Sequence, residues 1–156
     1  MAGILSVAGT LAGAVGIFFG FALLSGEPAR AISVVTVATV GVVGVLAFVR
    51  HVVFHRADAA RLGWETDRPD WMFEVGFANL GFGVMGVLSV VVSAGPKAQG
   101  LLLLGYALYL LQAAALHGYR YFADGRRSPA RLWRSCIATA LFAGMMVFFA
   151  VSALVA

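Results

Sequence analysis

Five long stretches of apolar residues follow one another along the chain, separated by short segments of turn and charged residues. They predict helices at about 3–24, 31–55, 70–93, 98–121 and 131–155. A helix that crosses a bilayer needs about 20 mostly apolar residues, and each stretch is that long. The breaks carry Gly, Pro and charges, as in Gly26-Glu27-Pro28 and Gly95-Pro96-Lys97. The pattern predicts an all-α polytopic membrane protein, a bundle of five transmembrane helices in a single membrane domain over residues 1–156.

The composition supports this class and excludes several others. Hydrophobic residues make up 62% of the 156 positions and charged residues only 12%, whereas soluble domains average about a quarter charged residues. A soluble chain of this size could not bury so much apolar surface, and a disordered chain would not contain it. We therefore expect a lipid bilayer as the main partner, and no nucleic acid despite the net charge of +4.

The basic residues are distributed unevenly between the two sides of the predicted bundle. Nine of the eleven Lys and Arg fall at residues 50–68 and 120–134, and only Arg30 and Lys97 fall on the other side. All three Trp lie at the same boundary as the nine. Because cytoplasmic loops carry an excess of Lys and Arg, this asymmetry predicts a bacterial inner (plasma) membrane protein with its N-terminus and both long loops in the cytoplasm and its C-terminus outside.

The first four predicted helices form two hairpins with similar markers. Both turns have the pattern Ser-x-x-Pro, at 25–28 and 93–96, and both second helices end in His-x5-Ala-Asp, at His51–Asp58 and His117–Asp124. The similarity is consistent with two parallel helix-hairpin repeats followed by a fifth helix. The alternative is coincidence among turn and helix-end residues, which the short match and the two-residue difference in spacing favour.

All three histidines lie at the predicted cytoplasmic ends of the second and fourth helices. His51 and His55 are four residues apart, so a regular helix would place them on one face, and His117 would lie at a similar depth. Glu74 lies one turn inside the third apolar stretch, where a charge should face the bundle or a wet cavity and have a partner. His51, His55, Glu74 and His117 are a plausible ligand set for zinc, iron or copper.

Other interpretations of these residues remain open. Interfacial histidines and a Glu–Arg pair could simply fasten the helix ends. His51 and His117 could hold a haem between them, a less favoured arrangement with the nearby Arg50 and Arg120 available for the propionates. The group could also belong to a proton relay or a substrate path.

A second set of residues points to packing and to a buried polar network. Asn79, Tyr109 and Gln112 lie within apolar stretches, and their hydrogen-bonding groups would require partners there. Glycines recur every three or four residues on the first and third helices, which suggests close helix pairing inside the chain or between subunits. These glycines are Gly9, Gly13, Gly16, Gly20, Gly83 and Gly86.

The segment from Gly63-Trp64 to Gly86 contains the pattern Glu-x-Gly-x-Ala-Asn-Leu-x-x-Gly-Val-x-Gly, which begins at Glu74. Over about residues 63–86 the chain resembles an uncharacterised family of small bacterial integral membrane proteins. The resemblance implies no activity. Its pattern includes Glu74 and Asn79, which the distribution of polar residues also singles out.

No nucleotide-binding loop, nucleophile elbow or metalloprotease helix is present in the sequence, which therefore assigns no reaction. The working hypothesis is a small membrane protein with a cytoplasm-facing His/Glu pocket for a metal ion or a small polar ligand. One alternative is a transporter or channel subunit with a path lined by Glu74, Asn79 and Gln112. Another is a structural accessory subunit. We expect either a homo-oligomer or a subunit of a larger membrane complex.

Overall fold

The computed structural model describes residues 1–64, 67–123 and 128–155, and within these ranges it contains helices and no strand. Five of the described helices are long and apolar enough to cross a membrane, which confirms the predicted fold class. They comprise Ala2–Leu24, Pro28–Val53, Asp70–Val91, Pro96–Ala123 and Trp133–Val155. The observed bounds differ from the predicted ones by only a few residues, chiefly because Pro28 and Pro96 occupy first-turn positions where proline suits a helix.

Three of the five spans are single helices, and two are composite. The single helices are α1 (Ala2–Leu24), α5 (Asp70–Val91) and α6 (Pro96–Ala123). The second span contains α2 (Pro28–Val35), η1 (Thr36–Val42), α3 (Val43–Phe48) and η2 (Val49–Val53). The fifth contains η3 (Trp133–Ile137) and α8 (Ala138–Val155), preceded by the short α7 (Pro129–Leu132). A short helix outside the spans, α4 (His55–Leu62), follows the second span.

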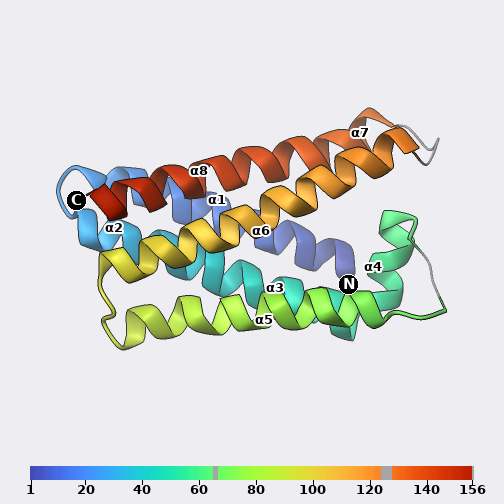
Figure 1. Ribbon diagram of the computed structural model, residues 1–156, viewed down its shortest axis with the longest axis horizontal. Helices are drawn as coiled ribbons and strands as arrows, with labels where there is room; N and C mark the ends of the chain where they lie inside the picture. The colour runs from blue at the N-terminus through green and yellow to red at the C-terminus, as the bar shows by residue number, and fades with distance from the viewer. Residues whose placement is uncertain (65–66, 124–127, 156) are drawn as a thin grey trace.

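The second span lies at the centre of the bundle. It packs between α1 on one side and α5 on the other, while α6 runs along α8 (Figure 1). In its most apolar stretch 44% of the residues are buried, compared with 22–28% in the other four spans. The start of α1 and helix α4 lie at one end of the bundle, and the end of α8 lies at the other with α2 (Figure 1). Polar residues on the second span are therefore the best placed to act inside the protein.

The second span approaches α5 very closely because both helices carry glycine at the crossing. A Cβ atom added to Gly44 would lie 2.7 Å from the backbone oxygen of Asn79 and 2.9 Å from the Cα of Gly83. Gly86 meets Gly41 and Val40 in the same way. Small residues allow such backbone contact between membrane helices, and here they fix the depth of Asn79 relative to the second span.

The glycines of α1 also face other helices of the same chain. An added Cβ at Gly16 would collide with the Cβ of Ala38, and one at Gly13 with the ring of Phe142. Gly9 and Gly20 are buried as well, the latter against Val35. All six glycines singled out in the sequence are buried within the chain, so these surfaces are already occupied.

The second span is not a regular α-helix where it carries Arg50 and His51. Residues Val49–Val53 form a π-helical turn, and the chain then breaks at Phe54, which has φ −109° and ψ 29°. A π-turn is wider than an α-turn and recurs at functional sites. The regular helical spacing on which the shared face of His51 and His55 was predicted therefore does not continue through this segment.

Helix α4 ends at Gly63, whose φ of 70° lies in the left-handed region that favours glycine. The backbone N–H groups of Gly63 and Trp64 donate to the carbonyls of Ala60 and Ala59, at 3.2 Å and 3.0 Å. This turn reverses the chain so that Trp64 stacks on His117 of α6, with ring centroids 4.8 Å apart.

Candidate functional site

A buried cluster of ionisable groups lies where the second span meets α4. Asp58 is completely buried, although it belongs to a helix outside the spans. Arg61, one turn further along α4, donates to Asp58 Oδ1 from Nε at 3.0 Å and from Nη2 at 2.8 Å. His51 Nδ1 lies 2.9 Å from Asp58 Oδ2, and Arg50 Nε lies 3.4 Å from the same oxygen. Three basic side chains therefore surround one carboxylate.

The surrounding groups keep Asp58 ionised. Burial by itself opposes ionisation and would raise the pKa of the carboxyl group. The hydrogen bond from His51, the charge of Arg50 and the hydrogen bonds from Arg61 outweigh burial and lower the pKa of Asp58 from 3.8 to about 2. At neutral pH the group is therefore a fixed negative charge, and its role is to hold Arg50 and His51 in place.

The contacts also define which nitrogen of His51 carries the proton. Arg50 Nη2 lies 3.1 Å from His51 Nε2, and a guanidinium can only donate. Nε2 must therefore accept, and in the neutral imidazole Nδ1 carries the hydrogen. Asp58 Oδ2 lies 2.9 Å from Nδ1, so its negative charge acts on the ring from that side and Nε2 is the basic site of His51.

A second group of hydrogen bonds lies next to this cluster in the bundle interior. Tyr106, which is fully buried, donates to Asn79 Oδ1 at 2.7 Å. Asn79 Nδ2 donates to Tyr109 Oη and to the carbonyl of Val75, both at 2.8 Å. The charge of Arg50 acts on both tyrosine hydroxyls. The Asn79 network and the Asp58 cluster are therefore linked electrostatically through Arg50.

A third polar group lies nearer the opposite end of the bundle. Ser33 donates to Gln99 Oε1 at 3.1 Å, and Gln99 Nε2 donates to the carbonyl of Ser89 at 3.4 Å. Between this group and Asn79, the second span carries the fully buried Thr36 and Thr39. Both donate to backbone carbonyls of their own helix, at 2.8 Å. Polar side chains thus recur at successive depths along the central helix.

The four residues proposed as metal ligands lie in separate environments. His55 directs Nδ1 to the carbonyl of Val52 at 3.0 Å and packs edge-on against Phe73. His117 stacks on Trp64, and Glu74 is exposed, contrary to the expectation that it faces the bundle. Among the residues that the structure describes, no group of three or more His, Cys, Asp or Glu is arranged to hold a metal ion.

The other residues predicted from the sequence as a ligand site or polar network also lie in different environments. Arg120 lies over the Trp64 ring, 5.9 Å from its centroid. The prediction that Gln112 is buried with Asn79 is wrong, because Gln112 is on the exposed face of α6. Asp124, the counterpart of Asp58 in the proposed repeat, lies outside the described residues.

Sequence reasoning assigned no role to Asp58, Arg61 or Tyr106. A signal for the first two was present, since Asp58 and Arg61 are three residues apart and could pair on any helix. Asp58 was noted only as part of the proposed repeat, because it follows the apolar stretch.

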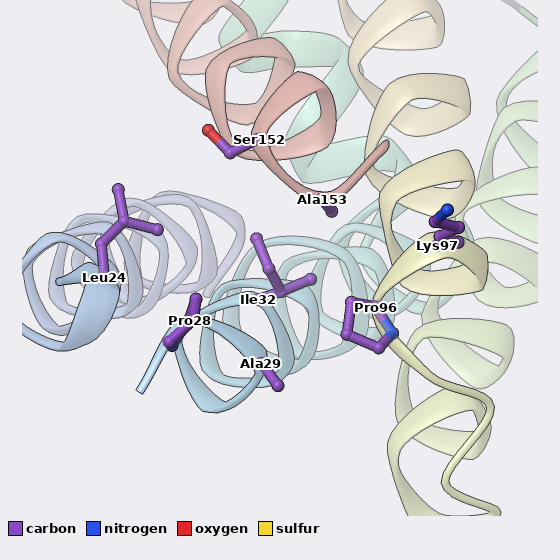
Figure 2. Close-up of a pocket in the computed structure, with 8 residues that line it drawn as sticks. All are labelled: Leu24, Pro28, Ala29, Ile32, Pro96, Lys97, Ser152 and Ala153. Carbon is purple, nitrogen blue, oxygen red and sulfur yellow. The ribbon is translucent and has the colours of Figure 1, made fainter. Parts of the chain in front are cut away.

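A cavity of about 290 Å³ lies at the opposite end of the bundle, where α1, α2, α6 and α8 come together (Figure 2). Apolar groups such as Leu24, Ile32 and Ala153 form most of its lining, and among the described residues that line it Lys97 carries the charge. None of the residues predicted from the sequence as a site lines this cavity.

The fold and the buried cluster define a small helical membrane protein with ionisable groups enclosed at one end of its bundle. The chain belongs to a family of unknown function, DUF6790, whose model matches residues 3–154. The match extends well beyond the segment that carried the resemblance in the sequence. No curated protein and no solved structure matches the chain. Its function must therefore be argued from the site.

Proposed function

We propose that this protein is a membrane transport protein that carries protons through its interior, with His51 as the group that accepts them near α4. The observation that supports this most strongly is the enclosed Asp58–His51–Arg50 cluster at the end of the second span, in which Asp58 and His51 are buried. Ionisable side chains within membrane spans are costly, and they commonly mark proton relays and ion paths.

The geometry suggests how a proton would be taken up. A proton that binds Nε2 turns His51 into an imidazolium, and Asp58 offsets the new charge from the other side of the ring. Arg50 Nη2 must then leave Nε2, because both atoms are donors. The charge of Arg50 already acts on the tyrosine hydroxyls of the Asn79 network, so a movement of the guanidinium would change the field at those hydroxyls. Arg50 would thus couple the protonation of His51 to the hydrogen bonds deeper in the bundle.

The experiment is a proton flux measurement on the full chain reconstituted in vesicles that contain a pH-sensitive dye. We expect flux above that of protein-free vesicles under an imposed potential, and we expect His51→Gln to reduce it to that background. His55→Gln is the matched control, because His55 lies just beyond the same span and its described contacts are with the Val52 carbonyl and the Phe73 ring. The proposal would be refuted if the wild-type protein gave no more proton flux than empty vesicles. It would also be refuted if His55→Gln reduced the flux as much as His51→Gln.

The orientation of the bundle is a further part of this proposal. We place the end that contains α4 in the cytoplasm of a bacterial inner membrane, with the C-terminus of the chain outside, because this end carries most of the arginines. His51 would then exchange protons with the cytoplasm.

Cysteine labelling in intact cells tests the orientation. In a Cys136→Ser background, Ala60→Cys on α4 should be protected from an impermeant reagent added outside. Ser25→Cys, in the exposed turn between α1 and α2, should react readily in the same cells. The reverse pattern would invert the topology.

A further inference from the structure

The chain contains three side-chain amides, and two of them are satisfied inside the bundle. Asn79 and Gln99 are 3% exposed, and both make the hydrogen bonds described above. Gln112 is different, because its side chain is exposed and no described residue forms a hydrogen bond with it. Its amide therefore points outward from α6 with its donors and acceptor unused.

Gln112 lies within the apolar part of α6. It precedes His117 by five residues and follows Lys97 by fifteen, which correspond to about 8 Å and about 22 Å along a helix with a rise of about 1.5 Å per residue. The amide of a glutamine side chain extends less far from the helix than either distance. Lipid tails offer no hydrogen bonds, so an amide at this depth is unfavourable unless protein supplies a partner.

The exposed residues around Gln112 follow the spacing of a helix-pairing surface. Leu101, Leu108, Gln112, Ala115 and Tyr119 are all exposed and, with the half-buried Gly105, alternate in steps of four and three residues. We call these six residues the α6 outer face. Steps of four and three keep one stripe facing a partner helix in left-handed pairs, the commonest packing of membrane helices. A single polar residue within such a stripe fixes register and partner number.

We propose that the α6 outer face pairs with the same face of a second copy of this chain, through reciprocal hydrogen bonds between the two Gln112 amides. Copies of one chain enter the membrane in the same orientation. A two-fold axis along the membrane normal therefore brings Gln112 to the depth of its own equivalent. An amide both donates and accepts, so it is complementary to itself.

This surface differs from the glycine stripes that the sequence suggested for oligomers. The stripes on α1 and α5 are occupied by neighbouring helices of the same chain, as at Gly16 against Ala38 and Gly86 against Val40. The α6 outer face is on the opposite side of α6 from Leu103, Tyr106 and Ala107, which are fully buried. A second copy can therefore bind there without disturbing the bundle or the Asn79 network.

The test is oxidative cross-linking of the full chain in native membranes, in a Cys136→Ser background. We expect disulfide-linked dimers from Leu108→Cys and Ala115→Cys. Leu141→Cys on α8 should not cross-link, although it is equally exposed to lipid, with 57% of Leu141 accessible. Equal cross-linking at all three positions would indicate random collisions and overturn the proposal. A product of another mass would indicate a different partner and would overturn it as well.

A second measurement isolates the amide. Gln112→Leu keeps the size and apolar surroundings of the side chain, so the protein should fold. It should weaken dimerisation in detergent by about threefold to tenfold, the range expected for one interhelical polar contact. Gln112→Asn should retain most of the association, since it keeps both donor and acceptor. Undiminished dimerisation in Gln112→Leu would show that the amide does not join the copies.

Discussion

Gly44→Ala should destabilise the protein strongly, by about 2 kcal/mol or more, because overpacking at this site cannot be relieved by a side-chain movement. The added methyl group would meet three backbone atoms of α5, namely the oxygen of Asn79 at 2.7 Å, the Cα of Gly83 at 2.9 Å and its nitrogen at 3.0 Å. The two helices would have to separate. Since one of these atoms belongs to Asn79, the change should also disturb its bonds to Tyr106 and Tyr109.

The measurement is the temperature at which the purified protein loses its fold in detergent. Gly81→Ala on α5 is the matched control, because nothing lies within 4 Å of a Cβ added there. It should leave stability unchanged or raise it by up to about 1 kcal/mol, since alanine favours helix more than glycine does. Equal melting temperatures for the two variants would contradict the close approach of α3 and α5.

Asp58→Asn should destabilise the protein by about 3 kcal/mol, because removing one partner of a buried ion pair leaves the other charge uncompensated. The substituted amide could still accept from Arg61, but it would not balance the charge of Arg50. Asp70→Asn is the control. Asp70 pairs with Arg68 at 3.7 Å on the surface, where an ion pair contributes less than about 1 kcal/mol. A similar loss in both variants would argue against a special role for the buried carboxylate.

The same residue predicts a pH dependence. The folded protein holds the pKa of Asp58 at about 2, below its ordinary value of 3.8. A lowered pKa stabilises the fold above the ordinary pKa, and this contribution is lost as the pH falls from about 4 towards about 2. Wild-type stability should therefore decline over that interval, and the part of the decline due to Asp58 should be absent in Asp58→Asn. Parallel pH profiles for the two proteins would refute the assignment.

The predictions for Gly44 and Asp58 concern two parts of the structure that act on the same polar groups. The glycine crossing sets the depth at which Asn79 meets the second span, and Asp58 sets the position of Arg50 at the end of that span. Arg50 then connects the two groups of hydrogen bonds. If protons pass through the bundle as proposed, both Gly44→Ala and Asp58→Asn should also reduce flux, whereas their controls should not.

The sequence by itself determined the five spans, because an apolar run of about 20 residues has few alternatives to a membrane helix. It also determined where the basic and aromatic residues collect, since this follows from the order of spans and loops. It identified Asn79, Tyr109, Arg50 and His51 as polar residues in an apolar context that required partners.

Only the tertiary structure decided which partners they have. A hydrophobic run specifies that a helix crosses the bilayer but does not specify its rotation about its own axis, because lipid and protein interior are similarly apolar. For that reason Gln112 could be assigned to the interior although it faces outward. The π-turn at Val49–Val53 and the break at Phe54 interrupt the regular helical spacing between His51 and His55. They also place α4 at the end of the bundle, so that Asp58, a residue beyond the span, is completely buried.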